Sequence, residues 1–194
     1  MRELALHILD IAENGISAGA NRIDITVDEA RSQDRLTIVI RDNGHGMPPE
    51  KMRHLTDPFV TTRSSRRVGL GLPLFAAAAT RCAGDLRVRS EPGKGTEVTA
   101  TFRLHHIDRA PLGDMAATIM TLILGNPHID VIYSHRVDGE SFELDTRDIR
   151  RQLGDIRLDD PVVMRTITES MRSSLHELAD ETSGKRGNHG KTKR

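Results

Sequence analysis

The stretch "RLTIVIRDNGHGM", residues 35–47, joins an alternating apolar pattern to an acid and two closely spaced glycines. Apolar residues at every second position predict a half-buried β-strand, and a strand needs partners in a sheet. The segments "IDITV" (23–27), "DLRVRS" (85–90) and "EVTATFRL" (97–104) alternate in the same way. An Asn-Gly pair after such a strand is ordinarily a hairpin turn, and that alternative stays open at this point.

Helical patterns are interleaved with these strands. Residues 3–18 show helical spacing of apolar residues, "PPEKMRHL" (48–55) predicts a short helix opened by proline, and "GLPLFAAAATRCAG" (71–84) predicts a helix closed by Gly84. The strands around "EPGKG" (91–95) form a predicted hairpin. We therefore expect an α+β sandwich that ends near Leu104.

The pattern changes after "HHIDRAP". A helix at 114–124, a hairpin of "DVIYSHRV" and "SFELD", and two helices at 147–153 and 160–178 predict a smaller α/β region over residues 105–181. The remaining residues, 182–194, carry five Lys and Arg, no acid and few apolar side chains. That composition predicts a basic disordered tail.

Composition narrows the classes of partner and compartment. The 28 Lys and Arg balance the 28 Asp and Glu among 194 residues, so no overall field favours nucleic acid or an anionic membrane. The single cysteine, Cys82, excludes an intrachain disulfide and a cysteine-based metal site. No apolar run approaches the roughly 18–20 residues of a membrane span. We expect a cytoplasmic protein with no membrane and no nucleic-acid partner.

The first helix has an ordered polar row. At about 100° per residue, its polar residues fall within one arc opposite the apolar ones; they are Glu3, His7, Asp10, Asn14 and Ser17. A solvated face of an amphipathic helix explains such a row. The alternative is chemical, because Asp10 and Asn14 lie one turn apart and their oxygens could hold a water and a hard cation.

Five segments in order carry a resemblance to a known family. They are "HILDIAENGISAGANRIDI", "DNGHGM", "DPFVTTR", "GLGL" and "EPGKGTEVTATF". In order and spacing they resemble the nucleotide-binding boxes of the GHKL superfamily, the Bergerat-fold ATPases and kinases that include DNA gyrase B subunits, heat-shock chaperones, MutL proteins, sensor histidine kinases and anti-sigma-factor kinases. The resemblance covers residues 1–104. It implies a histidine-kinase-like ATP-binding domain whose mixed, mostly antiparallel sheet has helices on one face.

The resemblance implies how the adenine of ATP is bound. Asp42 matches the acid that accepts a hydrogen bond from the adenine amino group, which a guanine carbonyl cannot supply. Gly44 and Gly46 match the glycines that let the backbone approach the base. Thr96 matches the hydroxyl residue that supports the acid and a water at the base, although a hydroxyl in a strand is as often only a cross-strand partner.

The resemblance also implies how the phosphates are held. Asn14 matches the asparagine that ligates Mg²⁺, with triphosphate oxygens and waters completing the shell. Residues 59–72 resemble a short ATP lid in which loop amides and a helix N-terminus face the phosphates. The lid residues expected to bind are Phe59, Thr62, Arg63, Gly69, Leu70, Gly71 and Leu72. Arg66 and Arg67 add charge-assisted bonds or form a solvated basic loop.

The expected rate of ATP hydrolysis depends on one acidic residue. Hydrolytic relatives have a glutamate as general base one helical turn before the magnesium asparagine, and here Asp10 occupies that position. Aspartate is one methylene shorter, and a displacement on the order of 1 Å costs about 100-fold in rate. Glu13 points about 100° away and is a poor substitute. We expect slow ATPase or protein-kinase activity on an unidentified protein partner; the alternative is a binding module whose lid regulates that partner without turnover.

The histidines give little further chemistry. His176, followed by Glu177 and Leu178, resembles a phosphoacceptor sequence without its proline and basic residue. The apolar stripe of its helix packs on the second region or on a twin subunit in a homodimer. Four further histidines show no metal-ligand spacing and no obvious acidic partner; they are His105, His106, His128 and His135.

Overall fold

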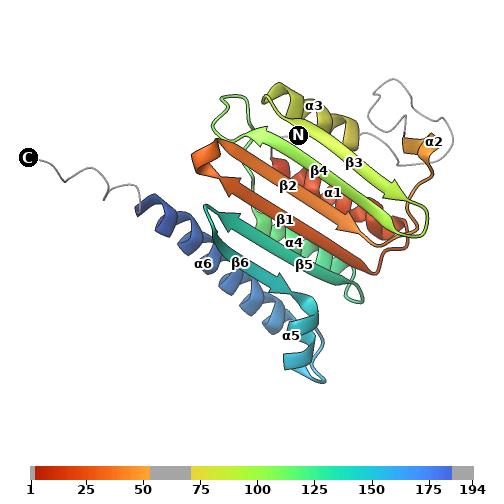
Figure 1. The fold of residues 1–194 in the computed structure, drawn as a ribbon. Coiled ribbons are helices and arrows are strands. Elements are labelled where there is room, and N and C mark those ends of the chain that lie inside the picture. The colour runs from red at the N-terminus through yellow and green to blue at the C-terminus, as the bar shows by residue number, and fades with distance from the viewer. Residues whose placement is uncertain (1–2, 53–70, 185–194) are drawn as a thin grey trace, which may run out of the picture.

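The computed structural model describes residues 3–52 and 71–184 (Figure 1). Its strands are β1 (Arg22–Ala30), β2 (Arg35–Asp42), β3 (Asp85–Glu91), β4 (Gly95–Arg103), β5 (Asp130–Val137) and β6 (Glu140–Asp145). Its helices are α1 (Leu4–Ser17), α2 (Pro49–Met52), α3 (Gly71–Arg81), α4 (Met115–Gly125), α5 (Thr146–Leu153) and α6 (Pro161–Gly184), and a 3-10 turn spans Arg31–Gln33. The expected elements are present, and β1 and α6 run further than their sequence patterns indicate.

All six strands form one sheet in the order β3-β4-β2-β1-β5-β6. Four of the five neighbouring pairs are antiparallel, and only β1 and β5 run parallel. The predicted mixed, mostly antiparallel sheet is therefore confirmed. The two strands from residues 105–181 extend the sheet that residues 1–104 begin, because Arg22–Glu29 pair directly with Asp130–Val137.

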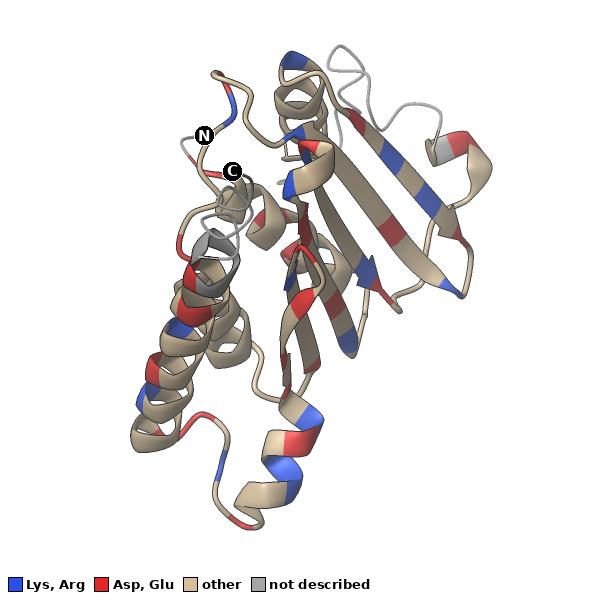
Figure 2. Cartoon of the chain, turned by 60° about the vertical axis from the view of Figure 1, so that its left-hand side comes forward, with Lys and Arg blue, Asp and Glu red and all other residues tan. Residues whose placement is uncertain are grey.

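The helices α1, α3, α4 and α6 lie on one face of the sheet (Figure 1). In this layer α1 packs against α3 and α4, and α6 packs against α4, β5 and β6. The alternation of β2 explains the arrangement, since Leu36, Ile38 and Ile40 are buried while the residues between them are more exposed. Charged side chains of both signs are interspersed over the strands and the C-terminal helices (Figure 2).

The core lies between the sheet and this helix layer. Its largest side chains include Tyr133, Phe75 and Phe102, all at most 2% exposed. The ring of Phe75 on α3 lies 5.7 Å from that of Phe102 on β4, so helix and sheet are joined by aromatic packing. Among the described residues, no helix has the length and apolar character that crossing a bilayer requires.

Candidate functional site

The candidate site lies where β2 ends, and Asp42 is its centre. Asp42 has the same parity as the buried residues Ile38 and Ile40, so its side chain is on the helix side of the sheet. Its carboxylate Oδ1 accepts a hydrogen bond from the backbone N–H of Gly44 at 2.8 Å. The turn after β2 thus holds the carboxylate in one orientation.

The last turn of α1 packs directly on this carboxylate. A Cβ on Gly15 would lie 2.7 Å from the Cβ of Asp42, closer than real Cβ contacts, and 3.1 Å from its Oδ2. A Cβ on Gly44 would lie 2.7 Å from the carbonyl oxygen of Ala18. Glycine is required at both positions because the helix end, the turn and Asp42 share one space. Gly15 was not among the predicted site residues.

Two loop contacts fix the segment "DNGHGM". The N–H of His45 donates to the carbonyl of Ala18 at 2.9 Å, and the side-chain oxygen of Asn43 accepts from the N–H groups of Asn21 and Arg22, both at 3.0 Å. Gly46 follows with a left-handed φ of +65°. The segment is tied to the α1–β1 connection, so the simple two-residue hairpin turn is wrong.

Thr96 is the direct cross-strand partner of Asp42 in the β2–β4 pair. Its Oγ1 lies 2.9 Å from the Oγ of Ser90 on β3. A cavity of about 240 Å³ at this end of the sheet is lined in part by Asp42, Ser90, Gly95 and Thr96. Arg41 and Glu97 form an ion pair at its edge, on the open face of the sheet.

The polar row of α1 is divided between solvent and core. Asn14 is exposed in the last turn, one residue before the glycine that abuts Asp42. Asp10 is half-buried, and a Cβ on Gly71, the first residue of α3, would lie 3.3 Å from the Asp10 Cβ. The structure therefore brings Asp10 to the start of α3 and Asn14 to the end of α1 nearest Asp42.

His7 is buried, although the polar row of α1 is explained by a solvated helix face. It is 5% exposed, and its ring stacks on Phe75 at 4.9 Å between centroids. Burial lowers the pKa of the imidazole, and a hydrogen bond with the Gly71 backbone opposes that shift in part. Its Nδ1 has no hydrogen-bond partner among the described residues. The helical pattern of α1 could not reveal this burial because α3 supplies it.

Several predicted residues of the lid lie outside the described residues. Leu72 follows Gly71 in the first turn of α3 and packs against the core. Phe59, Thr62, Arg63, Gly69 and Leu70, with Arg66 and Arg67, belong to residues 53–70 and stay predictions. No group of three or more His, Cys, Asp or Glu able to hold a metal occurs within residues 3–52 and 71–184.

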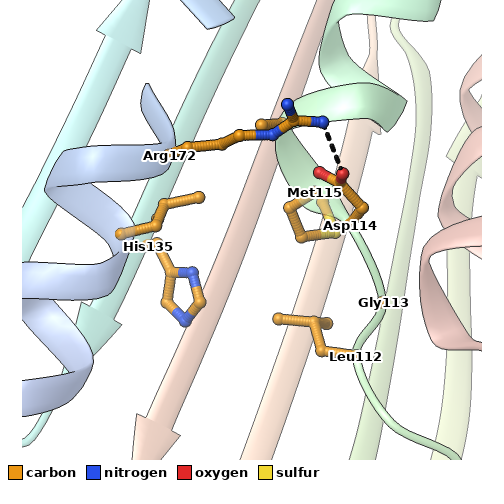
Figure 3. Close-up of a pocket in the computed structure, with 8 residues that line it drawn as sticks. Leu112, Gly113, Asp114, Met115, His135 and Arg172 are labelled. Atoms are coloured by element: carbon orange, nitrogen blue, oxygen red, sulfur yellow. Dashed lines mark hydrogen bonds and ion pairs between the residues drawn. The ribbon is translucent and has the colours of Figure 1, made fainter. Parts of the chain in front are cut away.

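A second cavity, of about 280 Å³, lies between α4, β5 and α6 (Figure 3). Asp114 and Arg172 meet at 2.8 Å on its lining, and the buried ring of His135 also faces it. His135 bonds through Nε2 to Glu29 at 3.0 Å and through Nδ1 to the Tyr133 hydroxyl at 2.9 Å. This acidic partner, which sequence reasoning did not identify, comes from a strand about a hundred residues away.

Three other histidines also have acidic partners. His105 lies 2.7 Å from Asp34, and His106 lies 3.9 Å from Asp108. His176 on α6 lies 3.0 Å from Asp180 with its side chain exposed to solvent. The prediction that His105, His106 and His135 lack acidic partners is therefore wrong. None of these pairs belongs to a group able to hold a metal within the described residues.

Comparison with known proteins agrees with this geometry. The family described as histidine kinase-, DNA gyrase B-, and HSP90-like ATPase matches residues 2–106. Sporulation kinase C of Bacillus subtilis is 34% identical over 88 residues, covering 45% of this chain and 20% of that protein. Sensor protein kinase FleS of Pseudomonas aeruginosa is 38% identical over 105 residues, covering 54% of this chain and 25% of that protein. The chain thus spans a quarter or less of these relatives.

A solved structure supports the fold. The crystal structure of the N-terminal domain of a DNA repair protein superposes with a TM-score of 0.56 at 17% identity, covering 86% of this chain and 56% of that one. At this identity the likeness shows the fold alone. Because the family match covers more than half of the 194 residues and includes Asp42, Gly44 and Thr96, the chain belongs to the histidine kinase-, DNA gyrase B- and HSP90-like ATPase family, which it matches over residues 2–106.

Proposed function

We propose that the protein binds Mg-ATP at the end of β2 and either hydrolyses it slowly or transfers its γ-phosphoryl group to a partner protein. The observation that carries this proposal is the fixed carboxylate of Asp42, held by the Gly44 N–H at 2.8 Å and covered by the last turn of α1. Membership of the ATPase family supports ATP as the nucleotide. The magnesium ion, the residues that hold the nucleotide, the reaction and the partner are all proposed.

Base selection follows from the chemistry of Asp42. Its Oδ1 accepts from the Gly44 N–H, which leaves Oδ2 to accept a hydrogen bond from the base. The 6-amino group of adenine donates such a hydrogen bond, whereas the 6-carbonyl of guanine would place an acceptor against a carboxylate. A site built on a hydrogen bond rejects a ligand that leaves its buried group unpaired. The proposed nucleotide is therefore ATP rather than GTP.

The magnesium ion would be held by Asn14 and by the nucleotide. Asn14 is exposed one residue from the glycine packed on Asp42, so its carboxamide oxygen is free to face a bound triphosphate. Mg²⁺ keeps several waters and commonly takes few protein ligands plus phosphate oxygens, which fits a single carboxamide. When bound, the ion would neutralise charge on the phosphates. Removal of Mg²⁺ should therefore weaken nucleotide binding.

Asp10 is the proposed general base. It lies on α1 one turn before Asn14 and beside Gly71, where α3 begins, so it faces the side on which the helix N-terminus would meet phosphate. Its carboxylate would take a proton from the attacking water, the water oxygen would bond to the γ-phosphorus, and ADP would leave. A positioned base contributes roughly 100- to 10,000-fold. The shorter side chain limits this contribution, so we expect slow turnover.

A second function follows if turnover is absent. The protein would then be an ATP-dependent binding module that regulates a partner protein through the predicted lid, residues 59–72, without turnover. The half-buried position of Asp10, whose reach is shorter than that of glutamate, favours this alternative.

The test uses Asp10→Asn, with Asp28→Asn on the open face of β1 as control. The proposal predicts that Asp10→Asn keeps ATP affinity within about threefold and lowers phosphate release by at least about 100-fold. The control should change neither quantity. Absence of turnover in the native protein, with a rise in melting temperature on adding ATP, would select the binding module instead. Incubation of cell extract with γ-labelled ATP identifies a phosphorylated partner.

A further inference from the structure

The hydroxyl of Ser90 connects three parts of the base site. Ser90 lies on β3 with the same parity as Leu86 and Val88, so it is on the helix side of the sheet. Its Oγ accepts a hydrogen bond from the Met47 N–H at 2.8 Å and donates one to the carbonyl oxygen of Gly95 at 2.9 Å. Its third neighbour is the Thr96 Oγ1, also at 2.9 Å.

The hydrogen atoms available decide the direction of this third bond. A serine hydroxyl has one proton to donate and two lone pairs to accept with. Ser90 donates its proton to Gly95, whose carbonyl oxygen can only accept, and one lone pair receives the Met47 N–H. The remaining lone pair accepts a hydrogen bond from the Thr96 hydroxyl. The Thr96 hydroxyl is therefore the donor, and only its lone pairs face the rest of the site.

Thr96 pairs across the strands with Asp42, so two acceptors lie next to each other. Directly opposed residues in an antiparallel pair have Cβ atoms about 4.5–5.5 Å apart. A carboxylate and a hydroxyl oxygen that both accept hydrogen bonds require a ligand group or a water with two hydrogens to donate. An exocyclic amino group has two such hydrogens, whereas a carbonyl oxygen has none and can satisfy neither acceptor.

We propose that Ser90 is a positioning residue that determines base specificity, because it orients the Thr96 hydroxyl so that the site accepts 6-amino purines and rejects 6-oxo purines. The inference rests on the proposed ATP site at Asp42 and extends it to a residue that need not touch the nucleotide. Without the Ser90 oxygen, the Thr96 hydroxyl is free to rotate and donate its proton to a 6-carbonyl. Loss of Ser90 should therefore relax selection more than it weakens binding of ATP.

The experiment measures ATP and inosine triphosphate binding by calorimetry in the presence of Mg²⁺. Inosine triphosphate has the 6-carbonyl of guanine without its 2-amino group, so its base differs from adenine only at position 6 and at the neighbouring N1. For Ser90→Ala we expect the affinity ratio of ATP to inosine triphosphate to fall by at least about fivefold, the range for one unmatched polar contact. Ser141→Ala, an exposed serine on β6, is the control and should leave the ratio unchanged.

A second variant tests the proposal in case Ser90→Ala does not fold. Thr96→Val removes the oriented hydroxyl itself and should lower the same ratio, with no further change in the double variant; Thr99→Val, on the open face of β4, is its control. An equal loss of both affinities, or an unchanged ratio, in either folded variant would overturn the role of Ser90 and leave the proposed function standing. Failure of the native protein to bind ATP would overturn both.

Discussion

At the scale of single residues, the candidate site depends on glycines that leave room for the neighbouring backbone and side chains. Gly15 shows this best, because nothing larger fits between α1 and the Asp42 carboxylate. The motif containing Asp42 was visible in the sequence, but the contact with Gly15 joins residues that are distant along the chain. His7 and Ser90 were missed for a related reason: each is polar on a face that other elements cover.

Gly15→Ala tests this close approach. The added Cβ would lie 2.7 Å from the Asp42 Cβ, so the carboxylate must move, and we expect ATP affinity to fall by at least about tenfold. Gly125→Ala at the end of α4 is a matched control, since a Cβ there meets nothing within 4 Å. Calorimetric titration of both variants separates the site effect from the general effect of alanine in a helix. Equal affinities in the two variants would contradict the packing described.

His7 gives a pH-dependent contribution to stability. Burial lowers its pKa in the folded state below the usual value of about 6.5, so the unfolded chain binds more protons as the pH falls below that value. The stabilising contribution is present above pH about 6.5 and is lost as the pH falls through the folded-state pKa. The charged group facing His7 on its own helix is Asp10, and α3 contributes the Gly71 backbone.

We expect the urea midpoint of the native protein to fall more between pH about 7.5 and about 5.5 than that of His7→Gln, because glutamine does not titrate. His128→Gln, at an exposed position outside the candidate site, is the control and should follow the native curve. Parallel curves for His7→Gln and the native protein would show that His7 titrates alike in the folded and unfolded states.

At the scale of elements, α4 packs between α1 and α6 in the helix layer, and Asp114 caps its N-terminus. Asp114 caps the helix by accepting from the Ala117 N–H at 2.8 Å, and its other oxygen pairs with Arg172 of α6 at 2.8 Å. The Ala117 hydrogen bond is the main reason that the pKa of Asp114 lies below its usual value, despite an opposing effect of burial.

Asp114→Ala should lower the free energy of unfolding by about 1 kcal/mol, the usual value of an N-cap. Arg172→Ala removes only the exposed ion pair and should cost about 0–1 kcal/mol. Chemical denaturation of both variants distinguishes the cap from the ion pair. If Arg172→Ala costs as much as Asp114→Ala, the ion pair and not the cap holds α4.

Local patterns predicted the elements better than their pairing. Alternation in "LTIVIR" and helical spacing in "LALHILDIAENGIS" identified β2 and α1, because each pattern is complete within its own segment. The parallel pairing of β1 with β5 joins residues more than a hundred positions apart, and no local pattern encodes it. Of the candidate site, Asp42, Gly44 and Thr96 were expected from motifs, and binding by them stays a prediction. Ser90 could have been found as a polar residue on the helix-side parity of β3.

At the scale of the whole molecule, one continuous sheet makes the two predicted regions interdependent. β1 lies between β2 and β5, and α1 packs against α4, so residues after 104 cover surface that residues before 104 would otherwise expose. Buried residues on both sides of the boundary, such as Ile25 and Tyr133, are paired in register across it. Stability is therefore expected to belong to the whole sheet.

A fragment of residues 1–106 tests this dependence. Its β1 edge and the apolar surface of α1 would be uncovered, so we expect loss of cooperative thermal unfolding or association at micromolar concentration. A chain ending at residue 184 keeps every described element and should unfold like the native protein. Cooperative unfolding of residues 1–106 at the native temperature would instead support an independent ATP-binding domain.

The most direct measurement of the central claim is calorimetric titration of the native protein and Asp42→Asn with ATP and GTP, with and without Mg²⁺. We predict that the native protein binds ATP, that Mg²⁺ strengthens this binding, and that GTP binds at least about 100-fold more weakly. Asp42→Asn should lose most of the ATP affinity while its melting temperature without nucleotide stays near the native value. Equal binding of ATP and GTP, or unchanged ATP binding in Asp42→Asn, would contradict the account.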